Sequence, residues 1–256
     1  MNLVDNTKEH REQREQEEEY SFPYHFASRF HPSFQTGFID YWAMNYNLTL
    51  ELVIDLVSRE HPSSLVDIGC GEGRLTHELN QAFPEMTVVG VDYSPQSICL
   101  ANTLVPNAKF HQTDITGEHS LGKFKAAVLM EVFEHIPDAE LQNFARATAE
   151  LVAANGLLIV TVPHKNKPLE YKHFRHYTTQ TLDAYFGPYF KSERVYFLEK
   201  TGWLNRLLNK LVANRVYVLN SPRLLNAIYQ TYRNQIFRCS GEDKCSRIAV
   251  CYRRSE

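Results

Sequence analysis

The stretch Leu65-Val66-Asp67-Ile68-Gly69-Cys70-Gly71-Glu72-Gly73-Arg74 decides how the rest of the chain is interpreted. A short apolar run ends in an acid, and three glycines then fall at alternate positions. Apolar residues follow at roughly helical spacing, at Leu75, Leu79, Ala82 and Phe83. This order predicts a strand, a tight glycine turn and a helix, which is the nucleotide-binding start of an α/β domain. Glycine suits such a turn because it accepts positive φ and lets a ligand lie against the backbone.

The spacing of the glycines separates two kinds of nucleotide ligand. A dinucleotide fingerprint reads G-x-G-x-x-G, and its third glycine lets helix and strand pack closely. Here Arg74 stands where that third glycine would fall, and Asp67 precedes the first glycine by two residues. A carboxylate repels a pyrophosphate but attracts an ammonium or sulfonium group. The stretch therefore favours a cationic nucleoside ligand.

The segment from Asp67 to Gly73 resembles motif I of class I S-adenosylmethionine-dependent methyltransferases, whose pattern is (D/E)-x-G-x-G-x-G. The resemblance implies S-adenosyl-L-methionine as the cofactor. It also implies a doubly wound, seven-stranded α/β sheet whose last strand is antiparallel. The cofactor-binding residues that it implies in the turn are Asp67, Gly69, Cys70, Gly71 and Gly73.

Length and charge set the domain organisation. The chain has 256 residues and a formal net charge of -3, so no global basic field points to nucleic acid as a partner. We expect residues 1–19, which are mostly charged, to form a disordered tail, and residues 20–256 to form a single domain. An N-terminal apolar h-region and long apolar runs are both missing, which predicts a cytoplasmic protein without a transmembrane segment. The five cysteines lack C-x-x-C spacing and are expected to be reduced.

A helical pattern over residues 34–59 precedes the glycine stretch. This position matches the extra helix that precedes the first strand in methyltransferases of this class. Its candidate core residues are Ile39, Trp42, Leu48, Leu50, Leu52, Val53 and Leu56.

Two further acids follow the next two predicted strands. Asp92 ends the strand 87–92, about 20 residues beyond the glycines, where such folds place a carboxylate on the ribose hydroxyls. The alternative is an ordinary turn residue at the end of a strand. Tyr93 adjoins it in the cofactor site, and Ser94 and Pro95 are expected to cap the next helix.

The third predicted strand, 108–111, precedes the adenine contacts that the resemblance implies. In the family an acid here accepts a hydrogen bond from the adenine amine, and the next backbone amide meets a ring nitrogen. Asp114 and Ile115 fit that pattern.

The fourth predicted strand, 125–130, leads directly into an E-x-x-E-H run formed by Glu131, Glu134 and His135. In a helical turn these three side chains share one face and converge. Two carboxylates and an imidazole suit a divalent cation such as Mg²⁺, Mn²⁺ or Zn²⁺. The alternative is that Glu131 and Met130 line the methionine end of the cofactor while the other two residues cap the following helix.

The E-x-x-E-H run resembles two groups of the superfamily. One is the ubiquinone-type O-methyltransferases, and the other is the plant-type 2′-O-methyltransferases of small-RNA 3′ ends. In the second group the run and a later histidine bind a metal that holds the two terminal hydroxyls. Transferred to this chain, that ligand set is Glu131, Glu134, His135 and His176.

A histidine-rich loop follows the fifth predicted strand, 157–162. Either His173 or His176 is a candidate to complete a metal site or, like His135, to act as a general base on an acceptor hydroxyl. The run 175–179 lacks the second acid-histidine pair of the small-RNA enzymes. It is more similar to the K-H-[YF]-x-H-[YF] segment of bacterial methyltransferases thought to act on glycans or small metabolites.

Residues 200–245 form an insert before the last strand. From residue 200 to residue 241 there is no acid, and the first half predicts a basic amphipathic helix. The insert is expected to be a helical lid; alternatively it binds an anionic substrate or makes a peripheral membrane contact through residues 200–238.

Together these features predict O-methylation of a small-molecule or glycan-type acceptor, which the basic residues allow to be anionic. Two alternatives remain open: metal-dependent methylation of RNA 3′ ends, and a non-catalytic module that only binds the cofactor. An amine acceptor also stays open.

Overall fold

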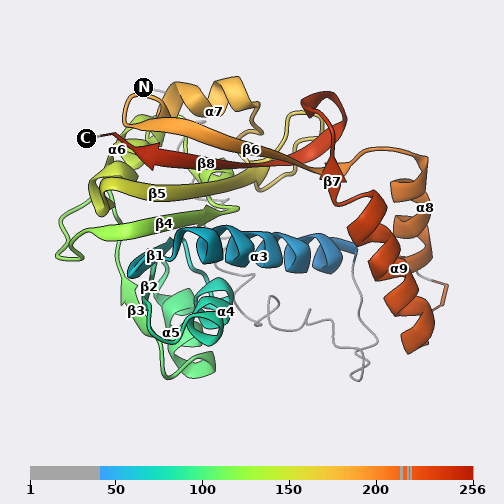
Figure 1. The fold of residues 1–256 in the computed structure, drawn as a ribbon, viewed down its shortest axis with the longest axis horizontal. Coiled ribbons are helices and arrows are strands. Elements are labelled where there is room, and N and C mark those ends of the chain that lie inside the picture. The colour runs from blue at the N-terminus through green and yellow to red at the C-terminus, as the bar shows by residue number, and fades with distance from the viewer. Residues whose placement is uncertain (1–40, 214–215, 218, 220, 256) are drawn as a thin grey trace.

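The computed structural model describes residues 41–213, 216–217, 219 and 221–255. The predicted tail 1–19 and Ile39 lie outside these residues. Eight strands form one sheet in the order β3-β2-β1-β4-β5-β8-β6-β7 (Figure 1). Their bounds are β1 Ser64–Ile68, β2 Thr87–Asp92, β3 Lys109–Gln112, β4 Phe124–Met130, β5 Val152–Pro163, β6 Phe190–Lys200, β7 Arg238–Cys239 and β8 Cys245–Arg254.

The sheet confirms the predicted fold class. Strands β1 to β5 pair in parallel, and β8 is antiparallel to both β5 and β6. The one strand that sequence reasoning did not foresee is the two-residue β7, which pairs with β6. Parallel strands end at the same edge of the sheet, so the acids and glycines that follow β1, β2 and β4 come together there.

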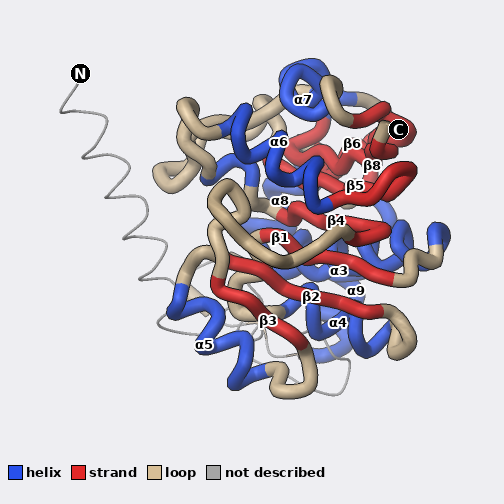
Figure 2. The backbone as a smooth tube through the Cα atoms, turned by 90° about the vertical axis from the view of Figure 1, so that its left-hand side faces the viewer, coloured by secondary structure: helices blue, strands red, loops and turns tan. Residues whose placement is uncertain are grey.

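Helices cover the sheet as a doubly wound fold requires (Figure 2). Their bounds are α3 Tyr41–Glu60, α4 Arg74–Ala82, α5 Pro95–Leu104, α6 Leu141–Leu151, α7 Thr179–Phe186, α8 Trp203–Val212 and α9 Pro222–Gln235, with single 3₁₀ turns η1 Phe133–His135 and η2 Glu242–Lys244. One apolar core joins the sheet to α3, α4, α8 and α9, and a second core joins its other face to α6 and α7. Within α3 the predicted core is confirmed for Leu48, Leu50, Leu52, Val53 and Leu56.

Local sequence signals explain several helix boundaries. The hydroxyl of Ser94 accepts a hydrogen bond from the amide of Ser97, and Pro95 is the first residue of α5, as the sequence predicts. Helix α4 begins directly at the glycine turn, with Gly73 at φ 83°. The backbone is thereby turned from β1 into α4 within a few residues.

The predicted insert contains α8, α9, β7 and η2, and both helices pack against α3. Its first half is an amphipathic helix, as expected. Among the described residues, no helix combines the length and apolar character that crossing a bilayer requires. The proposed contacts of the insert with anions or membranes stay predictions.

Candidate functional site

A cavity of about 570 Å³ opens at the carboxyl ends of the parallel strands. Its wall includes most of the cofactor-binding residues named from the sequence. These are Asp67, Gly69, Cys70, Gly71, Asp92, Tyr93, Asp114, Ile115, Met130 and Glu131. The topology therefore brings together, in one cavity, segments that lie up to 64 residues apart in the chain.

Two glycines of the turn are required by close packing. A Cβ on Gly69, which has φ 71°, would lie 2.6 Å from a methyl carbon of Val132. A Cβ on Gly73 would lie 2.6 Å from the ring of Phe110. Gly73 is not part of the cavity wall, so in this structure it serves the packing of α4 against the sheet.

Asp92 organises two backbone segments at once. One carboxylate oxygen accepts a hydrogen bond from the amide of Gly71, and the other accepts from the amide of Ser94, each at 2.9 Å. The carboxylate thus fixes the glycine turn relative to the start of α5. A carboxylate also suits the hydroxyls of a ribose diol, and that role of Asp92 stays a prediction.

The other two acids of the cofactor region differ in environment. Asp67 is buried and accepts a 2.7 Å hydrogen bond from the hydroxyl of Thr76, and burial raises its pKa to about 7. A cationic ligand group beside it would favour the charged form. Asp114 is exposed, and one of its oxygens accepts from the amide and hydroxyl of Thr116, leaving the other oxygen for a ligand.

A cluster of Glu134, His135 and His173 also lines the cavity. Among the described residues these three offer ligand atoms that all lie within 4.8 Å of one another. Glu134 and His135 come from η1, and His173 comes from the loop after β5. Two hydrogen bonds fix that loop to η1. The amide of Phe174 donates to the backbone carbonyl of Glu134 at 2.9 Å. The hydroxyl of Tyr177 donates to the backbone carbonyl of Phe133 at 3.0 Å.

Backbone carbonyls fix which nitrogen of each histidine faces the cluster. Nδ1 of His135 lies 3.1 Å from the carbonyl of Lys172, and Nδ1 of His176 lies 3.0 Å from that of Lys167. A carbonyl only accepts, so both Nδ1 atoms carry the proton. Nε2 of neutral His176 then accepts from Nδ1 of His173 across 2.8 Å. With Nδ1 protonated, Nε2 of both His135 and His173 carries a lone pair, and Nε2 of His173 lies 3.9 Å from a carboxylate oxygen of Glu170.

The electrostatics of the cluster suit a cation. Burial lowers the pKa of His135 to about 4 and that of His173 to about 2, so both imidazoles are neutral at pH 7. Burial also raises the pKa of Glu134 to about 8, and neither of its carboxyl oxygens has a hydrogen-bond partner among the described residues. Two neutral nitrogen ligands and a buried carboxyl group, which a bound cation would cause to lose its proton, therefore fit a divalent cation.

Two residues of the metal-ligand set expected from the sequence, Glu131 and His176, do not belong to the cluster. Glu131 turns away from the cluster: Thr161 donates to one of its oxygens at 2.7 Å, and Arg247 pairs with the other. His176 lies behind His173 and holds its tautomer. The unusual backbone of Glu131, with φ 60°, separates its side chain from that of Glu134, which an assumed helical turn does not anticipate.

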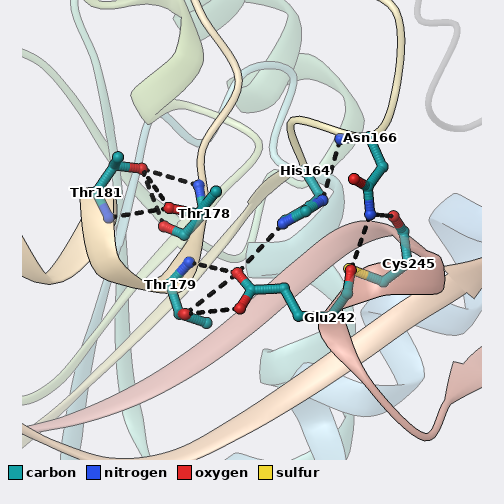
Figure 3. A network of polar contacts seen from close by, with 7 residues as sticks. All are labelled: His164, Asn166, Thr178, Thr179, Thr181, Glu242 and Cys245. Atoms are coloured by element: carbon teal, nitrogen blue, oxygen red, sulfur yellow. Dashed lines mark hydrogen bonds and ion pairs between the residues drawn. The ribbon is translucent and has the colours of Figure 1, made fainter.

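A separate polar network holds both ends of the histidine loop (Figure 3). Glu242 of η2 accepts from Nε2 of His164 at 3.2 Å and from the amide of Thr179 at 2.8 Å. The side-chain amide of Asn166 donates to the carbonyls of Glu242 and Cys245. The end of the insert thus anchors the segment that carries His173.

Arg247 and Trp42 are among the cavity residues that sequence reasoning did not assign to the site. Arg247 of β8 lines the cavity although it is fully buried. Trp42 was expected in the core, but its side chain is 37 % exposed, lines the cavity and stacks on Tyr46. The one available signal for Arg247 was a charged residue at the start of an otherwise apolar strand.

Comparison with known proteins identifies the family. A family model described as a methyltransferase domain matches residues 41–205, which is more than half of the chain. The chain belongs to this methyltransferase family. The methyltransferase is 33 % identical over 109 residues to a trans-aconitate 2-methyltransferase of Deinococcus radiodurans, a match that covers 42 % of this chain and 41 % of that protein. It is 41 % identical over 61 residues to a malonyl-[acyl-carrier protein] O-methyltransferase of Halalkalibacterium halodurans, covering 23 % of this chain and 22 % of the relative.

The chain thus matches less than half the length of these curated relatives. Among solved structures, the N-methyltransferase NodS of Bradyrhizobium japonicum WM9 in complex with S-adenosyl-L-homocysteine superimposes with a TM-score of 0.57 at 14 % identity, covering 83 % of this methyltransferase and 88 % of NodS. The likeness confirms the class I fold. The ligand of NodS in that structure is S-adenosyl-L-homocysteine.

Proposed function

We propose that this methyltransferase transfers the methyl group of S-adenosylmethionine to an oxygen atom of a small, anionic or glycan-type acceptor. The observation that carries the proposal is the continuity of the cavity, which joins the cofactor-binding residues to the cluster of Glu134, His135 and His173. A methyl donor and polar groups able to activate a hydroxyl can therefore share one enclosed volume.

The reaction needs alignment and, for a hydroxyl acceptor, removal of a proton. The acceptor oxygen forms a bond to the methyl carbon, the carbon-sulfur bond breaks, and sulfur keeps the electron pair as a neutral thioether. The proton leaves the acceptor for a base or solvent. Holding the two reactants in line supplies most of the rate enhancement in such a displacement.

The low pKa of His135 decides what the imidazoles can do. At pH 7 a group with a pKa of about 4 takes a proton at a cost of about 4 kcal/mol, so His135 is a weak general base. The same neutral lone pairs are good cation ligands. A divalent cation held by Glu134, His135 and His173 would lower the pKa of an acceptor hydroxyl and remove the need for a strong base.

Two observations support an oxygen acceptor with negative charge. The malonyl-[acyl-carrier protein] relative is named as an O-methyltransferase. The side chains of Lys167 and Lys172 also line the cavity. Lys167 pairs with Glu170, another cavity residue, so the attraction of an anion falls to Lys172. The metal-dependent RNA alternative draws its support from the same cluster, so the acceptor has to be found by experiment.

Methyl incorporation from labelled S-adenosylmethionine tests the proposal. The acceptor panel holds trans-aconitate, a malonyl thioester, catechols, sugar phosphates, primary amines and a short RNA with free 2′ and 3′ hydroxyls. We expect transfer to an oxygen of a small anionic acceptor, and His135→Ala should lower kcat at least about tenfold while leaving S-adenosylhomocysteine affinity unchanged. His119→Ala, at an exposed position outside the cavity, is the matched control.

Three outcomes would contradict parts of this proposal. Transfer to amines alone would overturn the oxygen acceptor. Transfer to RNA alone would favour the 3′-end alternative. Cofactor binding without transfer to any of these acceptors, despite intact structure, would favour the non-catalytic module.

A further inference from the structure

Arg247 is a buried cation at the cavity wall. Its neighbours are an acid and an amide: Glu131 pairs with Nη1, and the oxygen of Asn45, when turned toward the guanidinium, lies 2.8 Å from Nε and 3.1 Å from Nη2. Burial lowers the pKa of Arg247 to about 10, so the side chain stays charged at neutral pH. A charge buried to this degree requires close partners.

The known partners do not use the whole guanidinium. Arginine has five N–H donors in a planar fork. Asn45 and Glu131 take three of them, at Nε, Nη2 and Nη1. Among the described residues, one donor on each of the two terminal nitrogens has no further partner, and two such donors are what a carboxylate needs for a bidentate contact.

Arg247 points to the same face of the sheet as Asp67, the acid that precedes the glycine turn. Side chains alternate along a strand, and Leu65 of β1, Ile159 of β5 and Ala249 of β8 belong to the core shared with α3. Asp67, Thr161 and Arg247 lie two residues from Leu65, Ile159 and Ala249, respectively. Their side chains therefore point to the same face of the sheet. Asn45 belongs to α3 itself.

The pair of Glu131 and Arg247 also adjoins the glycine turn. Val132 follows Glu131 in the chain, and one of its methyl carbons lies 2.6 Å from the position that a Cβ on Gly69 would occupy. Glu131 itself lines the cavity beside Met130 and Gly69. An acid and a base thus stand together next to the turn that the amino-acid end of the cofactor approaches.

We propose that Arg247 binds the α-carboxylate of S-adenosylmethionine, with Glu131 facing the α-ammonium group. The amino-acid end of the cofactor is a zwitterion whose two charges complement this pair. Without ligand, Glu131 and Arg247 neutralise each other; with ligand, each gains an opposite charge, so no buried charge is left unpaired in either state. The proposal concerns the cofactor alone and holds whichever acceptor is methylated.

Truncated ligands test the assignment. S-adenosylhomocysteine carries the amino-acid end, whereas 5′-methylthioadenosine keeps the nucleoside and the sulfur but lacks that end. In calorimetry, Arg247→Met should weaken S-adenosylhomocysteine binding about 10- to 100-fold, because a charge-assisted bidentate contact is lost. Binding of 5′-methylthioadenosine should change less than about threefold, which also shows that the variant is folded.

Two companion variants complete the experiment. Arg253→Met removes another arginine of the same strand, which pairs with Glu60 and Glu193, and it should change neither affinity. Arg247→Lys keeps the positive charge but loses the planar pair of donors, so it should weaken S-adenosylhomocysteine binding by an intermediate factor. If Arg247→Met does not fold, Arg247→Lys replaces it in the experiment. Equal affinity of wild type and both Arg247 variants for S-adenosylhomocysteine would overturn the proposal, as would an effect confined to the KM of the acceptor.

Discussion

Nδ1 of His173 lies 2.8 Å from Nε2 of His176, and this contact decides which nitrogen of His173 faces the cavity. His176 is itself fixed by the carbonyl of Lys167, so a backbone atom outside the cluster sets the tautomer of a residue inside it. Such outer contacts orient the ligands of metal sites and tune their basicity. His176 is therefore a positioning residue, and its removal should act through His173.

His176→Ala should lower the affinity of the cluster for Mn²⁺ or Zn²⁺ about 10- to 100-fold, because His173 loses its orientation and its fixed tautomer. Isothermal titration calorimetry with the metal ion measures this affinity. S-adenosylhomocysteine affinity should stay as in wild type, since His176 does not belong to the cavity wall. A metal affinity unchanged by the substitution would show that His173 needs no support.

Glu134→Gln should abolish metal binding while keeping the fold. Glutamine keeps the size of the side chain but cannot carry the negative charge that a cation needs. Because burial raises the pKa of Glu134 to about 8, the cation has to displace a proton from the wild-type carboxyl, and the titration is done near pH 8. Adding Mn²⁺ or Zn²⁺ should therefore raise the Tm of wild type but not that of the variant, as expected for a ligand that binds the folded state alone. Equal stabilisation of both proteins would place the cation elsewhere.

Asp92→Ala should weaken cofactor binding at least about tenfold. The variant leaves the amides of Gly71 and Ser94 without acceptors, each at a cost of about 1–3 kcal/mol if it stays buried. To isolate the ribose contact, S-adenosylhomocysteine is compared with its 2′-deoxy analogue. Loss of the hydroxyl should weaken binding to wild type and have little further effect in the variant, whereas equal losses in both would leave Asp92 with its backbone role alone. Asp55→Ala, at an exposed position on α3, is the control.

Features encoded by neighbouring residues could be predicted from the sequence. The glycine turn, the cap formed by Ser94 and Pro95, and the acids at the strand ends each depend on a few adjacent positions, and the topology then brings them to one edge. The family resemblance added the doubly wound sheet and its antiparallel last strand, which local patterning alone does not give.

The rest of the site depends on contacts between distant segments. His173 replaces His176 in the cluster because the loop after β5 is fixed to η1 through Phe174 and Tyr177. Arg247 reaches the cavity because β8 inserts between β5 and β6, bringing a residue from the end of the chain beside Glu131. Neither arrangement follows from spacing along the sequence.

Asp67 should make stability depend on pH in a predictable direction. Burial raises its pKa to about 7 in the folded protein, whereas an unfolded chain has an aspartate pKa of about 3.9. Between these values the folded state holds a proton that the unfolded state has lost. The resulting stabilisation is complete below about pH 4 and is lost progressively as pH rises through about 7.

Asp67→Asn removes that titration and keeps an oxygen that can accept from Thr76. Urea unfolding of ligand-free protein at several pH values measures the difference in unfolding free energy between the two proteins. The variant should gain stability relative to wild type by up to about 4 kcal/mol between pH 4 and pH 7, and the difference should then level off. If the unfolding free energies of wild type and variant change in parallel with pH across this range, Asp67 titrates normally. The cavity around it would then admit enough water to solvate the carboxylate.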